Sequence, residues 1–466
     1  MIQCYIQINQ INLGVKIIAI MKVIEGSTIT SASESTIDCH QHQLVVIDDQ
    51  GYIARTVDET DRDFASIKAT AAQAGQLTTL GADEYLLPGF IDLHVHAPQW
   101  PNAGVALDRP LNEWLDTYTF PTEAKYKDVA FAKRVYDDLV GELLANGTTT
   151  VLYFGSVDNP ANLELAKACI NHNQRGFIGK VAMDNPDQTP ENYRDASAQS
   201  AVADTERFIH QLDQLNQTAS IKQTAVITPR FVPSCTPESL KGLGKLAKKY
   251  DLPVQSHCSE SDWENGYALA HYHKRDSEVL DEYGLLTDKA VMAHGTLLNQ
   301  SDLDTFKARG VAVAHCPISN VYFGNAVLPV SKLLEQHVKV GLGTDISGGY
   351  SPSIYQNIRQ AVMSSRMLND GVNSELRPEQ RGTSHQPISA KNGFYLATVG
   401  GAKSLHLQTG QIKAGYLADL QIVKSPLKAF DDESMDQVFE KIMYHASKAD
   451  IKQVFVQGKL AATANS

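Results

Sequence analysis

The sequence has few cysteines, and they do not form the close pairs that metal sites and redox motifs use. The six cysteines are scattered, and no two of them make a Cys-x-x-Cys pair. This spacing argues against a disulfide framework and a thiolate zinc site, and it excludes the zinc deaminase architecture that needs a Pro-Cys-x-x-Cys ligand pair. Scattered thiols fit a reducing compartment, so we expect a cytoplasmic protein. The cysteines are Cys4, Cys39, Cys169, Cys235, Cys258 and Cys316.

Basic charge and long apolar runs are also scarce. The formal net charge of −12 at pH 7 opposes tight binding to a phosphate backbone, so we expect no nucleic acid partner. The apolar run Ile17 to Met21 is short and precedes no small-residue cleavage site. It predicts a strand rather than a signal or membrane segment, and we expect no membrane partner. Without low-complexity tracts or solenoid repeats, the chain is predicted to be a soluble globular protein.

The length of 466 residues predicts one large domain with a smaller companion, because single cores stop growing near roughly 250 to 300 residues. Strand-like patterns occupy both chain ends, and residues 49–51 are a plausible hairpin turn. We predict a small β-sandwich domain built from residues 1–85 and 408–466 around a central domain of residues 86–407. Asp61 to Thr79 predicts a short helix in an insertion. The strands expected at the two ends are Leu44 to Asp48, Tyr52 to Val57, Leu417 to Val423, and Val454 to Leu460 broken by Gly458.

In the central region, short apolar strand candidates alternate with longer amphipathic stretches, which is typical of repeated βα units and a parallel sheet. Eight such strands predict an α/β fold of the (β/α)8 barrel type, with its active site at the C-terminal ends of the strands. An open doubly wound sheet is less favoured, since no Gly-x-Gly-x-x-Gly turn follows the first strand. The strands are Leu86 to Leu93, Thr149 to Tyr153, Gly176 to Lys180, Ala225 to Thr228, Val254 to His257, Val291 to His294, Val311 to His315 and Val338 to Thr344.

Two histidines, His94 and His96, follow the first of these strands. Because side chains alternate faces along a strand, Asp92, His94 and His96 are predicted to point the same way, with two imidazoles converging on one small volume. A His-x-His pair alone is a weak signal. Two further pairs are interpreted as surface residues: His40 with His42, and His271 with His273.

Other polar residues stand where the later strands stop. Each of them alone could be a satisfied core residue, but together they predict one site at the barrel mouth. Three imidazoles and a carboxylate suit a single Zn²⁺ per subunit, with water completing the site. The fourth strand ends without the lysine that bimetal barrels carry, and Lys180 is expected to make a salt bridge or to line the mouth. The strand-end residues are His257, His294, His315 and Asp345, and the predicted metal ligands are His94, His96, His257 and Asp345.

Hydrolysis is the chemistry that this set of residues predicts. Zinc lowers the pKa of a bound water to about 7, which supplies a nucleophile at neutral pH. Glu260 follows His257 by three residues and is predicted to act as general acid and base. We assign His294 to a hydrogen bond with the nucleophilic water or the tetrahedral intermediate, and Asp92 to the orientation of an imidazole.

These motifs resemble the amidohydrolase superfamily, specifically its single-zinc branch with a His-x-x-Glu motif, here His257 to Glu260. Within that branch, the chain is similar to guanine deaminases over nearly its full length. No metal or acid–base position departs from the family pattern; Pro98 and Cys258 differ only as spacer residues. The stretches that carry the resemblance are His94 to Gln99, Glu113 to Leu115, Tyr118 to Pro121, Asn146 to Thr150, Gly179 to Asp184, Thr228 to Phe231, Gln255 to Glu260, Met292 to Gly295, Ala314 to Pro317 and Gly343 to Gly349.

The resemblance implies hydrolysis of guanine to xanthine and ammonia by a homodimer. It implies that Glu260 protonates ring N3 and later the departing amine, and that Asp345 accepts a proton from the water. Gln99 and Arg230 would read the polar edge of the purine, and Phe231 would stack on its face. An arginine donor beside the purine carbonyl favours guanine over adenine. The implied catalytic set is Glu260, His294 and Asp345, and the implied substrate contacts are Gln99, Arg230, Phe231, His257, Glu260 and Asp345.

Two alternatives remain open from the sequence. The same chemistry serves a related aminohydrolase that acts on 8-oxoguanine, a pterin or an adenine nucleoside derivative. A catalytically silent scaffold of the same fold is the second alternative. The complete set of ligands together with Glu260 argues against the silent scaffold, because such a protein has no chemical reason to keep all five residues.

Overall fold

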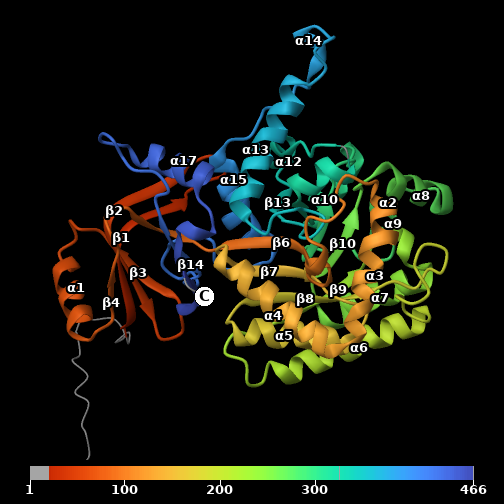
Figure 1. Ribbon diagram of the computed structural model, residues 1–466, viewed down its shortest axis with the longest axis horizontal. Helices are drawn as coiled ribbons and strands as arrows, with labels where there is room; N and C mark the ends of the chain where they lie inside the picture. The colour runs from red at the N-terminus through yellow and green to blue at the C-terminus, as the bar shows by residue number, and fades with distance from the viewer. Residues whose placement is uncertain (1–19, 325, 465–466) are drawn as a thin grey trace, which may run out of the picture.

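The computed structural model describes residues 20–324 and 326–464, which form a large barrel and a smaller β domain side by side (Figure 1). Of the predicted strand Ile17 to Met21, residues 17–19 lie outside the described residues, and strand β1 begins at Ile20. Within the described ranges, no helix combines the length and the apolar character needed to cross a bilayer.

The larger part is a parallel eight-stranded sheet in the order β13-β12-β11-β10-β9-β8-β7-β6. The chain closes the ring where residues after β13 meet the end of β6: Val95 forms a bridge with Ile346, and the Asp345 backbone N–H donates to the His94 carbonyl oxygen at 2.8 Å. The predicted (β/α)8 barrel is therefore confirmed. Its strands are β6 (Phe90–His96), β7 (Thr148–Phe154), β8 (Arg175–Ala182), β9 (Thr224–Pro229), β10 (Val254–Cys258), β11 (Ala290–His294), β12 (Ala312–His315) and β13 (Lys339–Leu342).

Amphipathic helices cover the outside of the barrel and alternate with its strands (Figure 1). α4 illustrates why they form: Asp128 accepts from two backbone N–H groups of its first turn, and Tyr136, Leu139 and Leu143 lie on its buried face. The principal outer helices are α4 (Val129–Ala145), α5 (Asn159–Asn171), α6 (Ala198–Leu215), α7 (Pro237–Tyr250), α8 (Asp262–Tyr272), α9 (Asp276–Glu282), α10 (Gln300–Arg309), α12 (Val330–Glu335) and α13 (Ile354–Asp370).

The prediction of one strand from Leu86 to Leu93 is wrong. The chain forms β5 (Glu84–Pro88) in the small sheet and then β6 in the barrel. The change of sheet falls at Gly89, where a Cβ atom would lie 2.3 Å from the Thr149 side chain. Only glycine permits this close approach of the two domains, and an apolar pattern alone does not reveal that the strand changes partners.

Both chain ends build the small β domain, as predicted, and they do so through one continuous mixed sheet in the order β16-β15-β14-β5-β1-β2-β3, with β4 beside β1. The sheet folds over itself, so that side chains of β1 to β3 pack against those of β14 and β15. The predicted segment Val454 to Leu460 is two strands that turn at Gly458. The strands are β1 (Ile20–Ser31), β2 (Ile37–Asp48), β3 (Ile53–Val57), β4 (Leu77–Thr79), β14 (Leu420–Lys424), β15 (Ile451–Val456) and β16 (Lys459–Thr463).

The predicted helix in the Asp61 to Thr79 insertion is present as α1 (Phe64–Gln73). Its buried residues Ile67 and Ala71 pack against Val23 and Val46 on the face of the sheet opposite the folded core. Helices from the chain's last third, α15 (Ala390–Tyr395) and α17 (Met435–His445), fill the space between the sheet and the barrel (Figure 1).

A buried ion pair fastens the two parts together. Arg175 of β8 pairs with Asp419, which immediately precedes β14. Asp419 also accepts from the Gln457 backbone N–H at 2.7 Å and from the Thr409 hydroxyl at 2.8 Å. Both charged groups are buried, so removing one of them is expected to destabilise the fold more than breaking a solvated ion pair would.

We expect Asp419→Asn to lower the free energy of unfolding by about 3–5 kcal/mol, because it leaves the Arg175 guanidinium buried without a counter-charge. Equilibrium unfolding in urea measures the change. Asp436→Asn is the matched control: it breaks the solvent-exposed pair with Lys391 and is expected to shift stability by less than about 1 kcal/mol. Equal effects of the two substitutions would contradict the stabilising role assigned to the Arg175–Asp419 pair.

Candidate metal centre and active site

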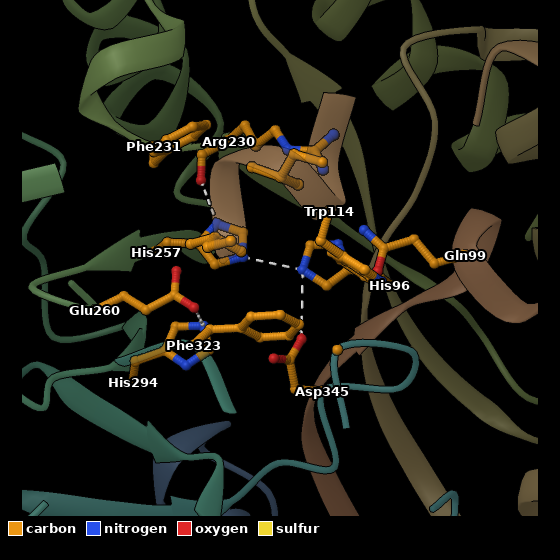
Figure 2. A pocket seen from close by; sticks show the side chains of 13 residues that line it. His96, Gln99, Trp114, Arg230, Phe231, His257, Glu260, His294, Phe323 and Asp345 are labelled. Atoms are coloured by element: carbon orange, nitrogen blue, oxygen red, sulfur yellow. Dashed lines mark hydrogen bonds and ion pairs between the residues drawn. The ribbon is translucent and has the colours of Figure 1, made fainter. Parts of the chain in front are cut away.

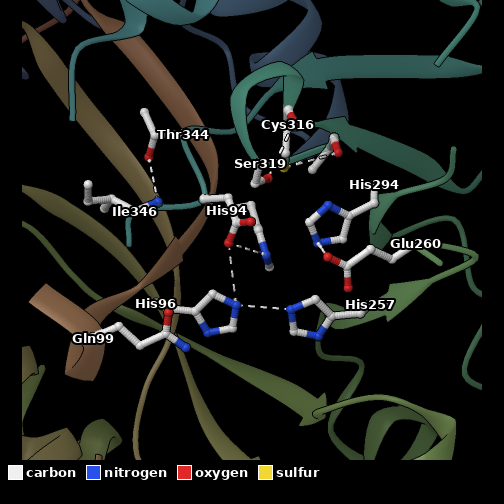
Figure 3. Close-up of polar contacts among 12 residues, drawn as sticks. His94, His96, Gln99, His257, Glu260, His294, Cys316, Ser319, Thr344 and Ile346 are labelled. Carbon is white, nitrogen blue, oxygen red and sulfur yellow. Dashed lines mark hydrogen bonds and ion pairs between the residues drawn. The ribbon is translucent and has the colours of Figure 1, made fainter. Parts of the chain in front are cut away.

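The residues predicted at the strand ends gather at one mouth of the barrel. His94 and His96 end β6, His257 lies in β10, His294 ends β11, and Asp345 lies three residues after β13. Figure 2 shows His96, His257, His294 and Asp345 pointing into one cavity together with Glu260, and Figure 3 adds His94 beside them. All the predicted metal ligands are thus brought together.

A bulge in β6 aims the two histidines inward. Asp92 pairs with Val151 and Val95 with Tyr153, so three steps along β6 match two along β7. Before the bulge, Leu93 packs inside the barrel with apolar side chains from five other strands and helix α16 (Gly401–Ser404). After it, His94 and His96 face the interior. An extra residue re-aims the following side chains, so the site sits directly above an apolar barrel core.

The imidazole nitrogens and one carboxylate oxygen converge on a small volume. Nε2 of His96 and Nε2 of His257 are 2.9 Å apart. Oδ1 of Asp345 lies 3.2 Å from Nε2 of His94 and 3.5 Å from Nε2 of His96. Ligand atoms of His94, His96 and His257 all lie within 4.8 Å of one another, and those of His94, His294 and Asp345 form an overlapping group.

The environment keeps these imidazoles neutral. Burial lowers the pKa of His94, His96 and His257 well below the ordinary value, and the neighbouring histidines lower it further. The carbonyl oxygen of Arg230 lies 2.6 Å from Nδ1 of His257, so Nδ1 carries the proton and Nε2 keeps its lone pair. A neutral imidazole with a free lone pair is the form that binds a metal.

The donor set fits a divalent cation. Nε2 of His94 is buried and has no hydrogen-bond partner in the described part of the chain, which is costly for a polar atom that nothing else satisfies. Three imidazole nitrogens and a carboxylate oxygen in one buried volume are the ligand types that zinc prefers. The three-histidine cluster therefore has the chemistry of a metal site.

Asp92 supports this cluster differently from the prediction. It was expected to orient an imidazole, but its carboxylate accepts from the His94 backbone N–H at 3.2 Å and from Thr344, whose backbone N–H lies at 2.9 Å and hydroxyl at 2.5 Å. The bulge turns Asp92 away from the histidine rings. Asp92 thereby joins the end of β6 to the segment that carries Asp345, and it fixes the backbone of both.

Glu260 is buried on the opposite side of the cavity from His96 (Figure 2). Its backbone N–H donates to Glu264 at 2.8 Å, and its carbonyl oxygen accepts from the Thr296 hydroxyl at 2.6 Å. Burial raises the pKa of the Glu260 carboxyl to about 8; Asp345 raises it further and Arg230 opposes the rise. A carboxyl with such a pKa is largely protonated at pH 7 and can donate a proton.

His294 lies beside Glu260, with 3.7 Å between Nε2 of the histidine and Oε1 of the glutamate. Nδ1 of His294 donates to the Asn320 side-chain oxygen at 2.9 Å, and Nε2 is buried without a partner among the described residues. His294 adopts φ 73°, in the left-handed region that side chains other than glycine rarely occupy. The strained backbone aims its ring at the cavity, consistent with a role in function.

The cavity has polar residues on the side away from Glu260. Gln99 and Arg230 both line it, as does Phe231, whose ring centroid is 6.0 Å from that of His257. Glu123, a residue that the sequence did not point to, accepts from both Gln99 and Arg230. The apolar walls of the cavity were also missed: Leu111, Trp114, Leu115 and Phe323.

Only part of this wall had a recognisable signal. Trp114 lies in a stretch that matched the family pattern, whereas Phe323 comes from a short helical segment, Asn320–Gly324, more than 200 positions away and meets it at a ring-centroid distance of 5.1 Å. Contact between segments that follow different barrel strands depends on the closed ring. Spacing along the chain does not encode it.

The remaining chemically capable residues lie outside the cavity. Lys180 makes a buried salt bridge with Asp195. His315 is buried, which lowers the pKa of its imidazole to about 3, and it does not line the cavity. The two look-alike pairs are at the surface: His40 pairs with Asp38 and Asp58, and His42, His271 and His273 are exposed.

Residues 85–461 of the chain match the amidohydrolase family. The chain belongs to this family. It is 34% identical to the guanine deaminase of Dictyostelium discoideum over 457 residues, which cover 94% of this chain and 98% of that protein.

Solved structures agree with the amidohydrolase assignment. A guanine deaminase from C. acetobutylicum with guanine bound in its active site superimposes with a TM-score of 0.84 and 29% identity, covering 94% of this chain and 99% of that one. Atrazine chlorohydrolase from Arthrobacter aurescens TC1, complexed with zinc, shares the fold with a TM-score of 0.78 and 19% identity over 94% of this chain and 95% of that one. This zinc-containing structure therefore has the same fold as the present chain.

Proposed function

We infer that this amidohydrolase is a guanine deaminase, which hydrolyses guanine to xanthine and ammonia. The observation that carries the inference is one cavity that holds both halves of the chemistry. The cavity is lined by His96, His257, Asp345 and Glu260, to which His94 adds the third histidine of the cluster, and also by Gln99 and Arg230. Similarity to guanine deaminases over 94% of the chain supports the same substrate.

Within this proposal, His94, His96, His257 and Asp345 hold a single Zn²⁺ per subunit. Their convergent donor atoms and neutral imidazoles support this choice of ligands. Zinc, when bound there, lowers the pKa of a coordinated water and stabilises charge that develops during attack. Lys180 is engaged by Asp195, and no lysine among the described residues lines the cavity, so none of these is placed to bridge a second ion.

The proton transfers are assigned to two carboxyl groups. Asp345 accepts the first proton of the attacking water, whose oxygen bonds to C2 of guanine. Glu260 gives its own proton to ring N3, and then carries the second water proton to the amine as the C2–N bond breaks. Ammonia leaves, and transfer of the proton held on Asp345 to the Glu260 carboxylate restores the starting state. The raised pKa of Glu260 supports this role, because a buried carboxyl that is protonated at neutral pH can act first as an acid.

His294 is assigned to a hydrogen bond with the attacking oxygen. Its Nε2 is buried, unpaired in the described structure and beside Glu260. Gln99 and Arg230 are assigned to the polar edge of the purine, and Phe231 to its face. The guanidinium of Arg230 can only donate hydrogen bonds, so it can bond to the carbonyl oxygen of guanine but not to the amine that adenine carries at that position.

Two further parts of the proposal rest on the family and the sequence. We assign a homodimer because the resemblance implies one. We assign a cytoplasmic location because the cysteines suit a reducing compartment: Cys39, Cys169, Cys235, Cys258 and Cys316 are free thiols in the structure.

The proposal predicts ammonia release from guanine by the zinc-loaded protein, with xanthine as the second product. A coupled ammonia assay with chromatography of the bases measures both. The same assay with 8-oxoguanine, a pterin and an adenine nucleoside separates the alternatives, because guanine is expected to have the highest kcat/KM of the panel. A higher value for any other member would replace guanine as the substrate, and no turnover with any of them would favour a silent scaffold.

A further inference from the structure

Glu123 contacts two polar residues of the cavity wall, Gln99 and Arg230, although nothing in its local sequence marks it as functional. It ends the short helix α3 (Phe120–Glu123), and its side chain is 1% exposed. Its carboxylate accepts three hydrogen bonds: from Nε2 of Gln99 at 2.8 Å, and from Nη1 and Nη2 of Arg230 at 2.7 and 3.1 Å. The Arg230 guanidinium also lies over the Phe120 ring, 5.0 Å from its centroid. Glu123 therefore holds both of the residues assigned to the purine edge.

These contacts fix which end of the Gln99 amide faces the substrate. A carboxylate only accepts hydrogen bonds, so Glu123 must face the NH₂ group of Gln99. A flipped amide would bring two oxygens together in a buried site. Oε1 of Gln99 is thereby left without a partner among the described residues, and it is buried. Gln99 lines the cavity, so this oxygen is an unsatisfied acceptor available to a ligand.

We propose that Glu123 is a positioning residue that sets substrate specificity by fixing Gln99 as an acceptor and Arg230 as a donor. The inference rests on the proposed function and extends it. An acceptor beside a donor complements a base whose edge carries an N–H group next to a carbonyl oxygen. Guanine has this arrangement at N1 and O6.

A purine with the opposite arrangement of donors and acceptors at positions 1 and 6 tests this proposal without changing the amine that reacts. 2,6-Diaminopurine has the same amine on C2 as guanine, but it presents an unprotonated N1 and an amine at C6. Bound in the same way, it would place N1 against Oε1 of Gln99 and its C6 amine against Arg230. Two buried mismatches of this kind strongly disfavour binding, since sites built around hydrogen bonds discriminate far more than apolar pockets do.

Glu123→Gln is expected to release the Gln99 amide from its fixed orientation. An amide at position 123 has only one acceptor oxygen, so it cannot accept hydrogen bonds from both Gln99 and Arg230 as the carboxylate does. The Gln99 side chain then becomes free to turn its NH₂ group into the cavity. We expect KM for guanine to rise more than kcat falls. The ratio of the inhibition constant of 2,6-diaminopurine to KM for guanine is expected to fall by at least about tenfold.

The exchanged pair Glu123→Gln with Gln99→Glu is the rescue variant. It keeps one negative charge near Arg230. It also restores an acceptor at position 99 beside the donor Arg230, because a carboxylate at position 99 offers only acceptors to the cavity. The amide at position 123 then donates to it and accepts from Arg230. We expect the ratio to recover to within about threefold of the wild-type value. Glu113→Gln is the control and should leave the ratio unchanged, because Glu113 is an exposed carboxylate of the same segment between β6 and β7 and is paired with Arg109.

The measurements are steady-state kinetics on guanine, inhibition by 2,6-diaminopurine, and thermal unfolding of each zinc-loaded variant. A folded Glu123→Gln protein with the wild-type ratio would overturn the inference, because a purely structural role lowers activity without altering preference. If that variant does not fold, the exchanged pair decides: a folded protein without guanine preference contradicts the inference. A wild-type protein inactive on guanine would instead refute the proposed function.

Discussion

Glu260→Gln is expected to lower kcat for guanine by a factor of about 10² to 10⁴, the range that general acid–base catalysis contributes. The amide keeps the shape of the side chain but cannot give a proton to ring N3 or carry one to the leaving amine. Zinc content and the thermal unfolding midpoint should stay close to wild type, because Glu260 lies outside the predicted metal ligands. Ammonia release, metal analysis and thermal unfolding measure the three quantities.

Asp262→Asn provides a matched control for this experiment. Asp262 is an exposed carboxylate two residues further along the same loop, at the start of α8, and its loss should leave kcat unchanged. Full activity in the Glu260→Gln protein would show that the proton is delivered by another group. Loss of zinc from that protein would show that Glu260 belongs to the metal site instead.

His96→Ala is expected to weaken zinc binding by more than about 100-fold, since partners that only support metal ligands already account for 10- to 100-fold in affinity. Added zinc should raise the unfolding midpoint of the wild-type protein, because a ligand that binds only the folded state stabilises it. The same addition should have little effect on the His96→Ala protein. The metal-to-chain ratio after dialysis and the zinc-dependent shift in unfolding are the measurements.

The second His-x-His pair supplies the control for the metal prediction. His42 is exposed in the small domain, far along the chain from the predicted metal ligands, and His42→Ala should retain one zinc per chain. A His96→Ala protein that keeps wild-type zinc affinity would remove His96 from the ligand set. Loss of zinc on His42→Ala would move the metal site to the other domain.

The barrel and the core of the site were predictable because both depend on local patterns. Parallel strands that alternate with helices must close in a limited set of ways, and the C-terminal ends of parallel strands share one edge. Residues that follow successive strands, such as His257, His294 and Asp345, therefore approach each other whatever the loops do. The His-x-x-Glu spacing likewise fixed Glu260 near His257 without knowledge of the fold.

Other features depended on partners that the local sequence does not name. Leu86 to Leu93 has the pattern of one strand, yet Gly89 passes the chain from one sheet to another. The face on which Asp92 lies was predicted from strict alternation, and the bulge in β6 altered it. Both errors arise from pairing with neighbouring strands, which an apolar pattern within one segment cannot specify.

The sequence by itself determined the two-part architecture, and it placed His94 and His96 with His257 and Asp345 at one end of the barrel, because strand order and strand ends follow from hydrophobic pattern and chain polarity. The tertiary structure alone decided what surrounds them. It brought Glu123 against Gln99 and Arg230, from loops after two different strands. Hydrogen bonds between distant loops depend on ring closure, so the direction of the Gln99 amide became visible only once the barrel was formed.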